Sequence, residues 1–238
     1  MMPTKSNSAE WSALVFALVF PTVLTWVYFI ALAYSEPWMQ KGAYGIGKVI
    51  QFAFPLVFVL LVRKERLHFR RLDTNGLVLA IGFGLLVAGA MLGLYFFWLK
   101  PAGFFAGPVT EEVKEKLKGF GITSLAAYAL LAVFYSLVHS LLEEYYWRWF
   151  VFGRLRNLTP LRAAVAISSV GFAAHHVLVL AKYFGWDSPA TWLFSAGVAI
   201  GGVVWAVVYQ RSKSLLGPWL SHLLVDAAIF AIGYDLMA

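Results

Sequence analysis

The segment from His139 to Arg148 places a histidine, two adjacent glutamates and an arginine in an otherwise apolar stretch. Such ionisable side chains are costly where lipid surrounds the backbone. On an α-helix, Glu144 and Arg148 are four residues apart and share a face, so they can pair. Glu143 lies about 100° further around the axis and shares its face with His139. The spacing therefore predicts a structural pair, Glu144 with Arg148, and a second carboxylate, Glu143, that is available for chemistry.

Two later stretches combine an imidazole with a partner four residues away. Phe172 precedes His176 by one helical turn, which packs the phenyl ring beside the imidazole. His175 points about 100° away and is the alternative for the same role. His222 and Asp226 also share one helical face. Because isolated burial of such groups in a membrane is costly, these residues are predicted to be functional.

These residue types suit hydrolysis of an amide bond. A carboxylate beside an imidazole can take a proton from water, and a second imidazole can donate to the developing oxyanion. Two imidazoles and a glutamate could equally bind zinc and leave a position for water, with Glu143, His176 and His222 as the candidate ligands. His139 is predicted to be a packing or supporting residue.

The composition predicts an all-α, polytopic bundle of transmembrane helices. Of the 238 residues, 61% are hydrophobic and only 13% are charged. Disulfides and thiolate metal sites are excluded because the chain has no cysteine. We expect one integral-membrane protease domain over residues 1–238, with the lipid bilayer and a membrane-associated peptide or protein as partners and no nucleic acid.

Charge-free stretches predict seven membrane spans. The fourth is long for a single crossing, since about 20 residues suffice, so it tilts, extends beyond the bilayer or breaks to give an eighth helix. Paired charges over residues 111–118 predict a helix at a surface. The predicted spans are residues 11–34, 42–62, 76–99, 120–152, 161–183, 189–210 and 214–236.

The Lys and Arg residues predict a cytoplasmic amino terminus. On that assumption the inner segments 63–75, 153–162 and 211–216 carry five, three and two cations, and Lys5 brings the total to eleven. The outer connections carry five. This asymmetry follows the positive-inside rule. The rule explains the net charge of +7 without binding of nucleic acid. The compact, cysteine-free chain suggests the plasma or inner membrane of a prokaryote.

Taken together, these residues resemble the CPBP or CAAX-protease (Rce1-like, also called Abi) family of intramembrane proteases. The family pattern places Glu-Glu-x-x-x-Arg, Phe-x-x-x-His and His-x-x-x-Asn or Asp on separate transmembrane helices. The resemblance covers about residues 120–236. The corresponding residues here are Glu143 and Glu144 with Arg148, Phe172 with His176, and His222 with Asp226.

The resemblance implies a role for each motif. Glu143 and His176 would activate water, and His222 and the residue at position 226 would stabilise the oxyanion. Glu144, Arg148 and Phe172 would support the structure. Members of the family are described both as metal-independent glutamate proteases and as metalloproteases, so a zinc cofactor stays open.

Position 226 departs from one branch of the family. The branch that removes a carboxy-terminal tripeptide after a prenylated cysteine has Asn where this chain has Asp226. An ionised carboxylate would repel an oxyanion. Asp226 is therefore expected to be protonated, to orient His222 or to help bind a metal.

We expect an intramembrane endopeptidase that cuts a membrane-associated or lipidated, CAAX-like peptide near the cytoplasmic face. One alternative is a non-catalytic relative that binds a peptide in the polar site and tolerates substitution of Glu143. The other is an ion-coupled transporter, in which buried acids relay charge and which needs access from both faces.

Overall fold

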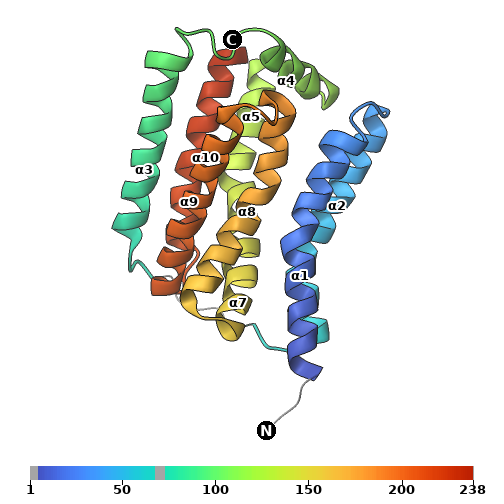
Figure 1. Ribbon diagram of the computed structural model, residues 1–238, viewed down its shortest axis with the longest axis vertical. Helices are drawn as coiled ribbons and strands as arrows, with labels where there is room; N and C mark the ends of the chain where they lie inside the picture. Colours follow the sequence, from blue (N-terminus) through green and yellow to red (C-terminus); the bar gives the residue numbers. More distant parts are fainter. Residues whose placement is uncertain (1–4, 68–72, 238) are drawn as a thin grey trace. The chain divides into compact units, whose positions relative to one another are not determined.

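The computed structural model describes residues 5–67 and 73–237, and these residues form helices and connections with no strand (Figure 1). Arg70 and Arg71, counted above among the inner cations, lie outside the described residues. The all-α prediction is confirmed. Seven helices in the described part are long and apolar enough to cross a membrane, and each overlaps a predicted span: Ser8–Ala31, Pro37–Val62, Leu77–Leu99, Leu125–Leu158, Leu161–Phe184, Pro189–Ser212 and Leu216–Met237.

The chain forms two compact units that alternate along the sequence. Unit 1 comprises Met1–Arg71 and Tyr145–Val207, and unit 2 comprises Leu72–Glu144 and Val208–Ala238. Unit 1 contains α1 (Lys5–Trp26), α2 (Pro37–Val57), the π-helical segment η5 (Tyr145–Phe152), α7 (Gly153–Leu158), α8 (Leu161–Phe184) and most of α9 (Pro189–Ser212). Unit 2 contains α3 (Leu77–Leu94), α4 (Pro108–Gly119), α5 (Leu125–Phe134), the π-helical segment η4 (Tyr135–His139), α6 (Ser140–Glu144) and α10 (Leu216–Met237).

The fourth span is a single helix of 34 residues, Leu125–Leu158. Of the three possibilities considered for this span, the break into an eighth membrane helix is not found in the described residues, and the paired charges of residues 111–118 form the short helix α4. Two π-helical segments, η4 and η5, interrupt the regular α geometry. A π-helix bonds residue i to i+5, so its turn is slightly wider than that of an α-helix. Residues four apart still lie close together there, as the stacked rings of Tyr145 and Trp149 in η5 show at 5.2 Å. The pairing of Glu144 with Arg148 is compatible with this geometry and stays a prediction.

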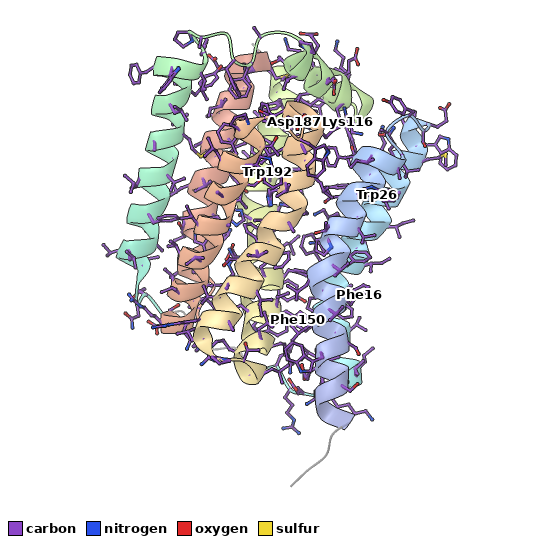
Figure 2. The ribbon with its side chains drawn as sticks, viewed as in Figure 1. Phe16, Trp26, Lys116, Phe150, Asp187 and Trp192 are labelled. Carbon is purple, nitrogen blue, oxygen red and sulfur yellow. The ribbon has the colours of Figure 1, made fainter. Side chains whose placement is uncertain are left out.

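Aromatic side chains fill the interior of unit 1. The Phe54 ring on α2 lies 4.4 Å from the ring of Phe16 on α1 and 5.7 Å from that of Phe150 on η5 (Figure 2). The hydroxyl of Tyr146 donates a hydrogen bond of 2.8 Å to the carbonyl of Ala17. These contacts attach the first helix of the unit to the part of the fourth span that follows the paired glutamates.

Four charged side chains hold one end of unit 1 together. Arg154 on α7 bonds Glu65 through both terminal nitrogens, at 3.0 and 2.5 Å. Glu10 on α1 accepts from Arg63 at 2.9 Å and from Arg154 at 3.2 Å. The hydrogen bond from Arg154 holds the pKa of Glu65 below its usual value. This charge cluster (Glu10, Arg63, Glu65 and Arg154) links α1, the segment after α2, and α7.

In unit 2, α10 packs tightly against α3 and against the start of the fourth span. A β-carbon at Gly84 would lie 2.9 Å from the carbonyl oxygen of Ser221, so only glycine allows the two backbones to approach this closely. The indole of Trp219 on α10 donates to the carbonyl of Leu137 in η4 at 2.9 Å. These contacts set the positions of α10 and α6 relative to each other within the unit.

Candidate functional site

Unit 2 brings two of the predicted motifs together around one imidazole. The Nδ1 atom of His222 lies 2.8 Å from Oε1 of Glu144. Its Nε2 atom lies 3.7 Å from Oε2 of Glu143 and 3.6 Å from Oδ1 of Asp226. His222, Glu143 and Glu144 are buried, with exposed fractions of 4%, 5% and 0%. We call these four residues the carboxylate cluster.

The contact between Glu144 and His222 was not predicted. Helical spacing assigned Glu144 to Arg148, because spacing within one helix carries no information about a partner on another helix. In the structure a ring N–H at Nδ1 donates to the Glu144 carboxylate, so Glu144 orients the imidazole. One of the three roles considered for Asp226 was to orient His222. At Nδ1 of His222, Glu144 makes that orienting contact.

The other ring nitrogen of His222 is directed at carboxyl groups. With Nδ1 donating to Glu144, Nε2 carries either a lone pair or a second proton. A lone pair facing two ionised carboxylates at 3.6 and 3.7 Å would be repelled. At least one proton therefore resides on Nε2 or on an oxygen of Glu143 or Asp226. Such a cluster can accept, hold and return a proton, which is what acid–base catalysis requires.

His139 lies near this cluster in sequence but is placed against an aromatic ring. Its imidazole is 4.6 Å from the ring of Tyr135, and Tyr135 is 5.5 Å from the ring of Phe230 on α10. His139 is the last residue of η4, and the regular helix α6 connects it to Glu143. The supporting role of His139 stays a prediction.

Unit 1 places the Phe-x-x-x-His motif among aromatic rings. The Nδ1 atom of His176 lies 3.0 Å from the carbonyl oxygen of Phe172, so the ring donates from Nδ1 and its Nε2 is the nitrogen left for chemistry. The Phe172 ring is 5.1 Å from the His176 ring, as the spacing predicted. We call Phe172, His175, His176, Trp147 and Arg148 the aromatic–imidazole cluster.

The two adjacent histidines of this cluster have different surroundings. His175 is buried and stacks on Trp147, with centroids 6.1 Å apart and planes inclined by 7°. It also meets the edge of Phe172 at 5.8 Å. His176 is half-buried. This difference favours His176 over His175 for a group that reacts with water.

Arg148 lies between two aromatic faces. Its guanidinium carbon is 4.8 Å from the ring centre of Phe172 and 5.2 Å from that of Trp205 on α9. The side chain is fully buried. Ring faces attract a cation, and the planar guanidinium stacks on them well. Arg148 therefore links the fourth span to α8 and α9 within unit 1.

The predicted residues thus divide between the two units. Glu143, Glu144, His222 and Asp226 are gathered in unit 2, whereas Phe172, His175, His176 and Arg148 are gathered in unit 1. The candidate zinc ligands Glu143, His176 and His222 are divided in the same way. Among residues 5–67 and 73–237 no group of three His, Asp or Glu side chains is arranged to hold a metal ion. The zinc site stays a prediction.

Comparison with known proteins identifies a family for the motif-bearing region. Residues 125–228 match the model for the type II CAAX prenyl endopeptidase Rce1-like family, which is a family of proteases. The matched segment contains every motif residue named above, from Glu143 to Asp226. No curated protein and no solved structure matches the chain significantly. The match confirms the predicted resemblance over residues 125–228, and with the seven apolar helices of the described part it supports an integral membrane protein.

Proposed function

From the membership of residues 125–228 in the Rce1-like family, we propose that this protein is an intramembrane endopeptidase. Its substrate is a membrane-associated or lipidated peptide with a CAAX-like end. The amino terminus is on the cytoplasmic side of a prokaryotic plasma or inner membrane, because the cations gather on that side. Cleavage takes place near the cytoplasmic face.

The observation that carries this proposal is the contact of His222 with three carboxyl groups inside the segment matched to a peptidase family. Isolated buried charges would be expelled or neutralised, so the grouping has to serve either packing or chemistry. A cluster that shares a proton between an imidazole and carboxyl oxygens is suited to moving protons during hydrolysis of an amide.

In the proposed reaction, Glu143 takes a proton from water, and the resulting hydroxide attacks the scissile carbonyl carbon. The resemblance to the family assigns His176 a part in activating the water, for which Nε2 is the relevant nitrogen because Nδ1 donates to the carbonyl of Phe172. His222 donates from Nε2 to the oxyanion, and Glu144 stabilises the charged imidazolium through Nδ1. When the C–N bond breaks, the proton taken by Glu143 passes to the leaving amine.

In this reaction the carboxyl group of Asp226 is protonated and therefore neutral. A neutral carboxyl group beside Nε2 of His222 adds a second donor for the oxyanion, whereas an ionised one would repel it. This assignment gives the aspartate the function that an Asn has in the prenyl-protein branch of the family.

Peptide cleavage in liposomes tests the proposal. The purified protein would be given a farnesylated CAAX-like peptide, its unprenylated form and a transmembrane peptide, with and without a zinc chelator. We expect Glu143→Gln to reduce cleavage by about 10²- to 10⁴-fold, since an amide of the same shape cannot take the proton. Glu115→Gln, an exposed change on α4, is the matched control and should cleave like wild type.

The outcomes separate the alternatives. Cleavage by Glu143→Gln at the wild-type rate would show that the assigned base is wrong. Peptide binding without any cleavage by wild type would identify a non-catalytic relative, and ion flux into vesicles would identify a transporter. Loss of activity with the chelator, restored by zinc, would assign a metal to the reaction.

A further inference from the structure

A cavity of about 200 Å³ lies in unit 2, away from the carboxylate cluster. Its lining combines two ammonium groups, hydroxyl groups and apolar side chains, contributed by α4, the connection to α5, the first turns of α5 and the end of α10. The lining residues are Lys114, Leu117, Lys118, Ile122, Thr123, Ser124, Leu125, Tyr128 and Met237. From Leu125 to Glu143 the helix rises about 27 Å, so the cavity and the cluster are separate sites.

The cavity lies at the ends of two helices of unit 2 that are long and apolar enough to cross a membrane. Leu125 is the first residue of the fourth span, and Met237 is the last residue of the seventh. In Figure 1, α4 is drawn at the end of the unit where α5 begins and α10 ends. A ligand here would have one part at the depth of lipid headgroups and another beside apolar chains.

The charge of the lining is positive. Lys114 and Lys118 are one helical turn apart on α4, and the lining residues include no acid. Lys114 pairs with Glu111 at 3.6 Å, but the two side chains are 33% and 69% exposed, so this pair is weak and easily exchanged. Asp235, two residues before Met237, is already engaged by Lys100 and by the hydroxyl of Tyr95, each at 2.6 Å.

The floor of the cavity is set by a close approach. Tyr128 is buried on α5 and packs against Phe230 and Tyr234 of α10. A β-carbon at Gly233 would lie 1.9 Å from the Tyr128 hydroxyl oxygen, so the absence of a side chain there determines where this ring lies. These neighbours hold the ring of Tyr128 in place, so the packing of α5 against α10 forms one wall of the cavity.

We propose that this cavity binds the phosphate of an anionic phospholipid headgroup. The two lysines and the hydroxyl groups of Thr123 and Ser124 would contact the phosphate oxygens, and the Leu117, Ile122 and Leu125 side chains would contact the glycerol and the first acyl carbons. The volume corresponds to about six or seven water molecules, which is room for a phosphodiester and its glycerol carbons. This site is independent of the proposed peptidase reaction.

Native mass spectrometry of the full chain in a neutral detergent tests the assignment. Phosphatidylglycerol, phosphatidylcholine and inorganic phosphate would be added in turn to wild type and to the double variant Lys114→Gln/Lys118→Gln. We expect the double variant to bind phosphatidylglycerol about 25-fold more weakly, with about fivefold from each lysine. Its affinity for phosphatidylcholine should not change. Thr123→Val, which removes a hydroxyl at constant shape, should weaken phosphatidylglycerol binding by a smaller factor.

Lys116→Gln is the matched control. Lys116 is on the same helix but does not line the cavity, and Figure 2 labels it on α4. It should keep the affinity of wild type for phosphatidylglycerol. An equal loss in Lys116→Gln would overturn the proposal, because it would show general charge attraction. Equal binding of phosphatidylglycerol and phosphatidylcholine by wild type would also overturn it, as would displacement of the lipid by an equal concentration of inorganic phosphate.

Discussion

The carboxylate cluster of unit 2 and the aromatic–imidazole cluster of unit 1 stabilise buried ionisable groups in opposite ways. In unit 2 a single imidazole contacts three carboxyl groups and the charges neutralise one another through shared protons. In unit 1 the rings of Phe172 and Trp205 cover the arginine, and a backbone carbonyl accepts from His176. The first arrangement transfers protons readily, whereas the second restrains side chains in one orientation.

This comparison assigns different consequences to substitutions in the two clusters. Substitutions in the carboxylate cluster should change the rate of peptide cleavage and its pH dependence more than they change the free energy of unfolding. In the aromatic–imidazole cluster, substitution of His176 should reduce the rate of peptide cleavage. Substitution of its neighbours should mainly lower the free energy of unfolding. Substitutions in both clusters test this division.

The adjacent histidines give the largest contrast. His176→Phe should reduce peptide cleavage by about 10²- to 10⁴-fold, because Nε2 of the half-buried ring is lost as an acid–base group. His175→Phe should retain cleavage within about tenfold, since a phenyl ring can still pack on Trp147 and Phe172. Initial rates on the same peptide measure both. A larger loss in His175→Phe would reverse the assignment of the two residues.

Glu144→Gln should reduce cleavage by about 10- to 100-fold, the effect expected for a group that orients a reacting side chain. The amide still reaches Nδ1 of His222 but no longer stabilises a charged imidazolium. The pH–rate profile should therefore shift, which a purely structural role would not cause. Glu144→Asp keeps the charge and should recover part of the rate. An unshifted profile in Glu144→Gln would place this residue outside the chemistry.

Arg148→Met should lower the free energy of unfolding by about 2 kcal/mol, because the buried cation loses its contacts with the faces of Phe172 and Trp205. The midpoint of denaturant unfolding in detergent measures the change. Arg162→Met, at an exposed position on α8, is the control and should change it by less than about 0.5 kcal/mol. Equal effects of the two changes would argue against a stabilising role for the aromatic faces.

Glu65→Gln should cost up to about 1 kcal/mol of stability at pH 7, the range expected for a half-exposed ion pair. The pKa of Glu65 is lower in the folded state than in the unfolded state, chiefly because Arg154 donates to its carboxylate. Its contribution is therefore complete above the ordinary glutamate pKa and is lost as the pH falls through the lowered value. The difference in unfolding free energy between wild type and variant should shrink below about pH 4.5. A difference that grows in acid would contradict this assignment.

Much of the fold follows from the sequence. Long apolar stretches separated by charges predict membrane helices because a span needs about 20 apolar residues, and all seven predicted spans overlap helices of the structure. The paired charges on either side of Lys114 predicted the surface helix that is observed as α4. The spacing of Phe172 and His176 also predicted their contact, since both residues lie on the regular helix α8.

The class of protein, the spans and the motif residues follow from composition and from spacing within one helix. The partners of those residues follow from the packing of separate helices, about which neither pattern carries information. The bond between Glu144 and His222 depends on how α6 and α10 pack, and the hydrogen bond from Trp219 on α10 to Leu137, just before α6, is part of that packing. Likewise, the cavity beside Lys118 forms where α4, the start of α5 and the end of α10 meet.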